Sequence, residues 1–274
     1  MTHERQALTR RLLNIRACWS AVLLAIGLVL AWPSARAAEV VQIAAEDDWA
    51  PYSSVAAAGG QPVGFAVDLV REAFATQGVE VRFVGVPFAR CMYMAKLGQV
   101  AGCFNATIVD DNKADYHWHP SPMFHEELAV FSRAGGGEKG IGLRQLEGKR
   151  VGYTLGYTYP AEFRQNDKIL KFSAKSDHML LDMLLARRVD YILINTAPAY
   201  LRLNTLGKPL SQFAKVGTLS VDGFWIAFTR AGHDGQRLAA LFERGLAALR
   251  ASGRYQAMEA EFRRRLGMAA RTNP

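Results

Sequence analysis

The chain contains one short pattern twice. Residues Ala95 to Thr107 and Ala186 to Ala197 each read as the end of a helix, a tight turn, a short buried strand and then an asparagine beside a small or hydroxyl residue. The copies lie far enough apart for each to belong to its own α/β lobe. Parallel α/β sheets bind ligands at the carboxyl ends of their strands, so two such ends facing each other would line a cleft. The repeat therefore predicts a two-lobed ligand-binding protein.

The first 37 residues have the pattern of a secretory signal peptide. An apolar run from Ala21 to Trp32 follows several arginines, and Ala35-Arg36-Ala37 supplies an A-x-A cleavage signal. The apolar run is short for a membrane-spanning helix, which needs about 20 residues. We predict cleavage after Ala37 and a periplasmic protein. An uncleaved membrane anchor is the alternative.

The remaining chain has the size of two small lobes. Removal of residues 1–37 from 274 leaves 237, which suffices for two lobes of roughly 100 residues each. It also removes five Arg and one Glu, so 28 basic and 24 acidic residues remain, with a net charge of +4. No basic run and no aromatic-basic patch stands out, which argues against nucleic acid as a partner. With no second long apolar stretch, we expect a soluble protein and, by default, a monomer.

Two cysteines remain after cleavage, Cys91 and Cys103. An oxidising compartment permits a disulfide between them. The predicted helix that holds Cys91 advances about 1.5 Å per residue, and the following strand returns about 3.3 Å per residue, so the two side chains can meet. We predict a disulfide; two buried free thiols are the alternative. Two thiols without other ligands nearby do not make a metal site, and we expect neither metal nor cofactor.

The first part of the mature chain alternates between strand and helix patterns. The spacing of Val67, Val70, Ala73 and Phe74 is helical, and the alternation in 79–84 is typical of a strand. These patterns predict strands at 40–44, 79–84, 100–104 and 127–132, and helices at 65–77 and 88–97.

A glycine run at 135–137 marks a boundary, after which the pattern restarts. Asp177 is expected to N-cap a helix. The arginines at 263–265 suit the negative end of a terminal helix dipole. The predicted strands are 150–154, 189–194 and 224–229, and the predicted helices are 143–146, one near Ala161, one after Asp177, one from Pro198, a stripe over 238–249 and 255–266.

This order of elements predicts that the two ends of the chain build one lobe. We expect lobe 1 to comprise 38–132 and 223–274, and lobe 2 to comprise 133–222. Two crossings, near Ser132 and Asp222, would then form a hinge between the lobes.

Several motifs, in the right order, resemble the extracytoplasmic solute-binding proteins of family 3. They are Gly64 to Leu69 (similar to G-F-x-V-D-L), Leu146 to Gly152 (L-x-G-K-x-V-G), Arg188 to Tyr191 (G-x-V-D-A) and Gly253 to Tyr255 (G-x-Y). The resemblance covers nearly the whole mature chain. It implies a two-lobed type II periplasmic binding protein fold of the α/β class, with a central mixed sheet in each lobe. It further implies a non-enzymatic protein that delivers a small polar solute, such as an amino acid, to the permease of an ABC importer.

The same resemblance implies where the solute would bind. By position, Glu46 and Trp49 would lie at the rim of lobe 1, and Phe88 would form an aromatic wall; core packing is the alternative for both rings. Backbone and hydroxyl groups would come from two segments, namely Phe104, Asn105 and Thr107 in lobe 1 and Gly156, Tyr157 and Thr158 in lobe 2. The second segment lies near a predicted helix N-terminus, which can receive an anion.

Two positions depart from the pattern of amino-acid binders in this family. Those proteins usually carry an arginine that pairs with the ligand carboxylate and an aspartate that takes its ammonium group; here Asn112 and Asn195 stand at those positions. Charged hydrogen bonds contribute roughly 1.5–3 kcal/mol and neutral ones about 1 kcal/mol, so an ordinary zwitterion should bind weakly. Lys113 and Arg90 are the alternative partners for a carboxylate. We expect a neutral or singly charged polar solute held by amides and aromatic rings.

Two other functions are compatible with this fold. A periplasmic lyase resembling cyclohexadienyl dehydratase would need an acid or base in the cleft, and the candidates are Glu46, Asp110, Asp111, His117 and His119. A non-transport partner protein, docking on a sensor or an oxidoreductase, is the other alternative.

Overall fold

The computed structural model describes residues 39–56, 60–135, 139–205, 207, 210–232 and 234–266; the predicted signal peptide lies outside these ranges. The described strands are β1 (Glu39–Glu46), β2 (Asp48–Trp49), β3 (Ser53–Ser54), β4 (Val79–Val86), β5 (Gly102–Ala106), β6 (Phe124–Arg133), β7 (Arg150–Thr154), β8 (Leu170–Ala174), β9 (Tyr191–Asn195) and β10 (Phe213–Phe228). The helices are α2 (Phe65–Ala75), α3 (Phe88–Lys96), α4 (Leu143–Leu146), α5 (Ala161–Arg164), α6 (Asp177–Leu185), α7 (Thr196–Thr205), the 3-10 helix η1 (Leu210–Gln212), α8 (Gly235–Ala251) and α9 (Arg254–Arg265). Among these helices none has both the length and the apolar character needed to cross a membrane.

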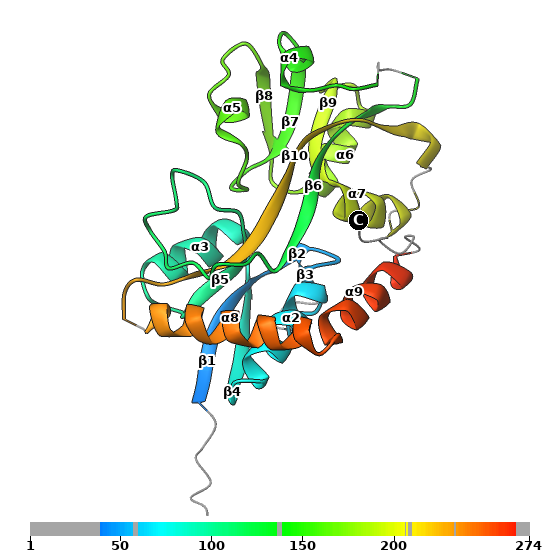
Figure 1. Cartoon of the computed structure of the whole chain (residues 1–274). Coiled ribbons are helices and arrows are strands. Elements are labelled where there is room, and N and C mark those ends of the chain that lie inside the picture. The colour runs from blue at the N-terminus through cyan, green and yellow to red at the C-terminus, as the bar shows by residue number, and fades with distance from the viewer. Residues whose placement is uncertain are drawn as a thin grey trace, which may run out of the picture. The chain divides into compact units, whose positions relative to one another are not determined.

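The main sheet is mixed and has the strand order β4-β1-β5-β10-β6-β9-β7-β8. At one end β1 pairs in parallel with β4 and β5, and at the other β7 pairs in parallel with β8 and β9. The two long strands β6 and β10 are antiparallel and paired from Phe124 to Arg133, and they run through the middle of Figure 1 from one group of helices to the other. The chain therefore forms two α/β lobes joined by two continuous strands.

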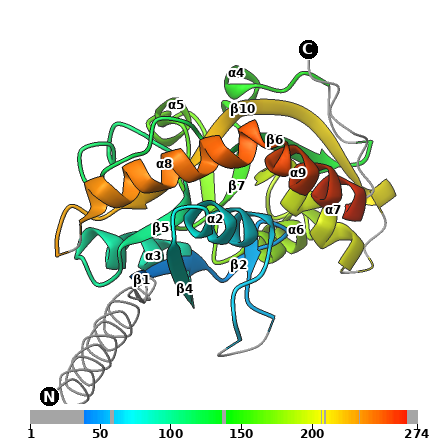
Figure 2. The ribbon, with the colours of Figure 1, turned by 60° about the horizontal axis from the view of Figure 1, so that its bottom comes forward.

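The first lobe packs around α2 and α8, which lie beside each other in Figure 2. The helical spacing seen in the sequence is confirmed, because Val67, Val70, Ala73 and Phe74 are all buried in this core. Gly64 precedes α2 with a φ of 138°, and a Cβ there would lie 2.4 Å from the carbonyl oxygen of Tyr52. Only glycine fits this approach, which explains the glycine at the start of the motif.

The repeated pattern forms the same unit in both lobes. In the first lobe α3 ends before Gly98, with a φ of 70°, and β5 follows; in the second α6 ends before Arg187, with a φ of 57°, and β9 follows. A Cβ at Gly98 would meet the carbonyl oxygen of Ala231 at 2.2 Å, which demands glycine there. Each copy therefore places an asparagine at or next to the end of a parallel strand, Asn105 before the last residue of β5 and Asn195 as the last residue of β9.

Two sequence predictions need correction, and one strand was not predicted. Strand β8 was not predicted, because four of its five residues, Leu170 to Ser173, are partly or fully exposed and show no alternating burial. Strand β10 begins at Phe213 rather than at Phe224, so Asp222 lies inside a strand. Ser176 rather than Asp177 caps α6, accepting a hydrogen bond from the Met179 amide.

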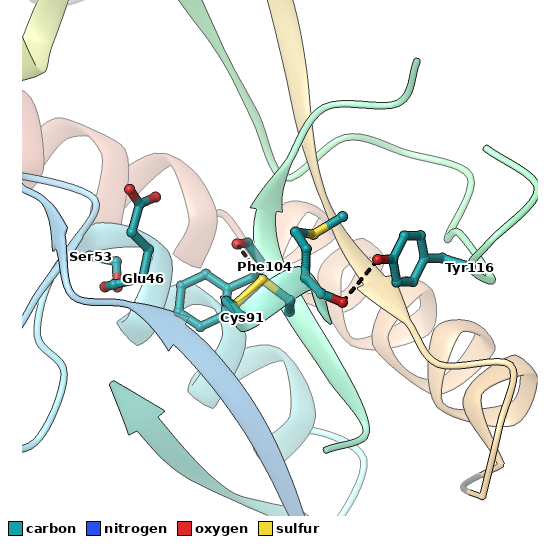
Figure 3. Close-up of a disulfide and its surroundings, with 7 residues drawn as sticks. Glu46, Ser53, Cys91, Phe104 and Tyr116 are labelled. Atoms are coloured by element: carbon teal, nitrogen blue, oxygen red, sulfur yellow. Dashed lines mark hydrogen bonds between the residues drawn. A yellow bond between two sulfur atoms is a disulfide. The ribbon is translucent and has the colours of Figure 1, made fainter. Parts of the chain in front are cut away.

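The predicted disulfide is present. Cys91 in α3 and Cys103 in β5 are bonded, with their Cα atoms 5.5 Å apart (Figure 3). Both cysteines are fully buried among Ala44, Ala95 and neighbouring apolar residues. The bond ties α3 to the strand that leads to Asn105.

Candidate functional site

A cavity of about 390 Å³, counted out to its open mouth, lies where the two lobes meet. It is lined by Glu46, Trp49, Phe88, Asn105, Thr107, Leu128, Tyr157, Thr158, Asn195, Asp222 and Phe224. Glu46, Asn105 and Asn195 belong to the carboxyl ends of β1, β5 and β9, and Tyr157 follows β7. The carboxyl ends of parallel strands from both lobes therefore face one space, as the repeat predicts.

Asn105 is the most unusual residue of this cavity. Its backbone has a φ of 65°, in the left-handed region, which asparagine tolerates better than most residues. Its side chain is 3% exposed, and within the described chain neither the Nδ2 nor the Oδ1 atom has a hydrogen-bond partner. A buried amide without partners costs free energy, on the order of 1–3 kcal/mol. Asn105 therefore brings an unpaired donor and an unpaired acceptor to the lining of the cavity.

Glu46 places a carboxyl group at the same cavity. It is 4% exposed, and burial raises its pKa from 4.5 to about 8. A hydrogen bond from Tyr157 acts in the opposite direction, whereas the negative charges of Asp177, Asp48 and Asp47 raise the pKa further. The backbone carbonyl of Glu46 accepts a hydrogen bond of 2.6 Å from the Ser53 hydroxyl, and this contact holds the end of β1 in place.

Aromatic rings form much of the wall. Trp49 and Phe224 have ring centroids 4.9 Å apart, and Phe88 and Tyr157 meet edge to face at 5.9 Å. Tyr157 lies in the second lobe but packs against cores of both lobes, and its hydroxyl is 3.5 Å from the carbonyl oxygen of Asp48. Burial raises the pKa of Tyr157 well above its usual value, so the hydroxyl stays protonated and can donate.

An ion-pair network beside the cavity joins the lobes. Arg202 of α7 donates from Nη2 to the carbonyl oxygen and the carboxylate of Asp48, at 2.5 and 2.8 Å. Its Nε lies 3.9 Å from the carboxylate of Asp177, which also accepts a 2.5 Å hydrogen bond from Thr154. Burial raises the pKa of Asp177 to about 6, and the charge of Arg202 lowers it in part. A second pair, Arg164 with Asp111 at 2.5 Å, joins the lobes elsewhere.

Most of the residues predicted for the site line this cavity, and their binding role stays a prediction. Three of them do not line it. The Phe104 side chain is fully buried against Phe83, and Gly156 packs against Ala89, whose Cβ would lie 3.1 Å from a Cβ at Gly156. The Asn112 amide bonds to its own loop, with Nδ2 donating to the carbonyl oxygen of Thr107 and Oδ1 accepting from the amide of Val109.

Sequence reasoning missed the residues that β6, β10, α6 and α7 bring to the site. Leu128, Asp222 and Phe224 line the cavity, and Arg202 and Asp177 stand beside it. Arg202 had no local signal, since its partner Asp48 is 154 residues away in the sequence.

The candidates for acid–base catalysis do not gather at the cavity. Asp110 pairs with Lys113, and the backbone of His117 pairs with Phe228. His119 is buried against Phe242, and its Nε2 accepts a hydrogen bond from the Ile226 amide. Of the five candidates only Glu46 lines the cavity, so the geometry does not assemble an acid–base pair from them.

The model of the bacterial extracellular solute-binding proteins, family 3, matches residues 41–264. The chain belongs to this family. The match spans both lobes and includes every residue that lines the cavity. No curated protein sequence matches the chain significantly.

Several solved structures share this fold. A mutant of ArgBP from T. maritima is 21% identical, with a TM-score of 0.69 over 81% of this chain and 94% of its own. A histidine kinase sensor domain with similarity to periplasmic binding proteins is 21% identical, with a TM-score of 0.72 over 82% and 96%. The substrate-binding protein of an amino acid ABC transporter is 15% identical, with a TM-score of 0.67 over 81% and 98%. These likenesses establish the type II periplasmic binding protein fold, with its two lobes and two crossing strands.

Proposed function

We propose that this family 3 protein is a periplasmic binding protein that captures a small polar solute between its lobes and delivers it to an ABC importer. The unpartnered amide of Asn105 carries the proposal, because a buried donor and acceptor facing a cavity need a polar ligand. The cavity lies at the junction of the lobes, so a solute there would stabilise their closed arrangement.

Delivery to an importer is supported by family membership. One protein of the same fold is the substrate-binding protein of an amino acid ABC transporter. The signal-peptide pattern of residues 1–37 and the Cys91–Cys103 disulfide fit an exported protein, since disulfides persist in oxidising compartments. The solute and the permease are the two partners that this function requires.

The first test is a thermal-shift screen of the purified protein against amino acids, amines, neutral amides, small acids and sugars. A solute at 100 times its dissociation constant stabilises the protein by about 2.7 kcal/mol, which raises the melting temperature by several degrees. Turnover of a prephenate-like compound, or a stable non-transporter partner without any solute response, would refute the proposal.

The matched variant is Asn105→Gly rather than Asn105→Ala. Glycine keeps the φ of 65° without strain, whereas alanine would be strained there, so Asn105→Gly isolates the loss of the amide. We expect solute binding to weaken by about 10- to 100-fold, because up to two hydrogen bonds are lost. The variant without solute should be as stable as the parent, since its unpaired buried amide is gone. Unchanged affinity would show that Asn105 does not face the solute.

A further inference from the structure

We infer that the solute is a small organic cation without a carboxylate, such as a primary amine or a guanidinium compound. This inference rests on the proposed function and names the class of solute for the same cavity. It follows from which charges line the cavity and from which neighbouring charges are already engaged.

The charged groups that line the cavity are acidic. Glu46 and Asp222 both contribute carboxylates, and no Lys, Arg or His side chain is among the described lining residues. Glu46 is almost fully buried and has no cation paired with it in the described chain. Ionising a buried carboxyl group that has no cation beside it is costly, and a cationic solute would supply the compensating charge.

Three cations that could have paired with a carboxylate of the solute, Arg202, Lys113 and Arg90, do not line the cavity. Arg202 directs its Nη2 at Asp48 and lies against Asp177, outside the lining. Lys113 pairs with Asp110 at 2.7 Å. Arg90 is exposed on α3 and does not line the cavity, so the described lining offers no cation to a carboxylate of the solute.

The neutral lining also suits a cation. The Oδ1 atom of Asn105 is an unused acceptor, and an ammonium or guanidinium group offers several donors. The rings of Trp49 and Phe224 complete the neutral part of the lining.

The test uses pairs of compounds that differ only by a carboxylate. They are agmatine with L-arginine, cadaverine with L-lysine and ethylamine with L-alanine, and propionamide serves as a neutral control. Calorimetric titration of the purified protein should show one amine binding at least tenfold more tightly than its amino acid. The Glu46→Gln variant, which keeps the shape and removes the charge, should weaken that amine at least tenfold. Asp68→Asn is the control, because it removes a carboxylate from the surface of α2 and should change nothing.

The outcomes separate this inference from the proposed function. If an amino acid binds as tightly as its amine, the inference is wrong, while binding that Asn105→Gly weakens still supports the proposed function. If propionamide or another neutral solute binds and Glu46→Gln leaves its affinity unchanged, the inference is again wrong and the function stands. If no compound of the full screen binds, both are wrong.

Discussion

Binding of a cation should release a proton from Glu46. In the protein without solute the pKa of this carboxyl group is raised to about 8, mainly by burial. At pH 7 about 0.9 of the molecules therefore carry the proton. A cation beside the carboxylate favours its ionised form and lowers the pKa again. If the bound carboxylate is fully ionised, binding at pH 7 releases about 0.9 proton per solute molecule.

The affinity for the cation should depend on pH through the same proton of Glu46. Below pH 8 it should rise by about tenfold per pH unit, and it should level off above pH 8, where Glu46 is already ionised. The groups that face Glu46 are Asp47, Asp48, Asp177 and Tyr157. The pKa of Asp177 is raised to about 6 and that of Tyr157 lies well above 10, so between pH 7 and 8 the proton comes from Glu46.

The assay is calorimetry with the amine that binds most tightly. The titrations are carried out at pH 7 in phosphate and in Tris, two buffers with different ionisation enthalpies. The slope of the measured binding enthalpy against the ionisation enthalpy of the buffer gives the number of protons released per solute molecule bound. Wild-type protein and Asp68→Asn should give the same slope, and Glu46→Gln should give almost none. Tight binding of an amine with no proton exchange at pH 7 would refute the reasoning about Glu46.

The same pKa predicts how stability depends on pH when no solute is bound. Folding raises the pKa of Glu46 from 4.5 to about 8, so the folded state keeps a proton that the unfolded chain loses. This contribution is fully present below pH 4.5 and is lost as the pH rises to about 8. Each unit of pKa difference corresponds to about 1.4 kcal/mol, so the contribution to the free energy of unfolding amounts to about 5 kcal/mol. In urea unfolding, the free energy of unfolding of Glu46→Gln should therefore increase relative to that of the wild type as the pH rises. A difference that does not change with pH would contradict the assignment.

The remaining predictions concern the disulfide and the ion pairs between the lobes. Replacing Cys91 and Cys103 by alanine should lower the free energy of unfolding by about 3 kcal/mol, measured with urea, because a closed loop of this length is lost. Replacing Arg202 by methionine should weaken solute binding about tenfold in calorimetry, although its side chain does not line the cavity, because its pairing with Asp48 and Asp177 stabilises the closed lobes. Unchanged affinity would show that these ion pairs do not favour closure.

The sequence predicted the elements that depend on local patterns. The helix Phe65–Ala75 and the strand Val79–Val86 were found because burial on one face imposes a period that the residues display. Strand β8 was missed because its residues are mostly exposed and carry no such period. Strand β10 was found only in part, since its first half, from Phe213, alternates weakly between buried and exposed positions.

The site could be predicted only where a residue follows a strand end. Asn105 and Asn195 were found because the repeated pattern places them at the carboxyl ends of two strands. Arg202 was not found, because its function comes from partners that only the folded chain brings near. Local patterns therefore locate the cavity, whereas the charges around it depend on the tertiary structure.

The sequence resemblance places Asn112 and Asn195 where amino-acid binders carry charged residues, and the structure gives these two asparagines different surroundings. Asn195 lines the cavity and remains available to a ligand. The donor and the acceptor of the Asn112 amide are both hydrogen-bonded to backbone groups of its own loop, those of Thr107 and Val109. Asn112 therefore cannot replace an arginine in pairing with a carboxylate. The acceptor for positive charge is instead Glu46, at the end of a different strand. A cavity whose described lining holds a buried carboxyl group and no cation favours amines over amino acids, before any contact with the rest of the solute is considered.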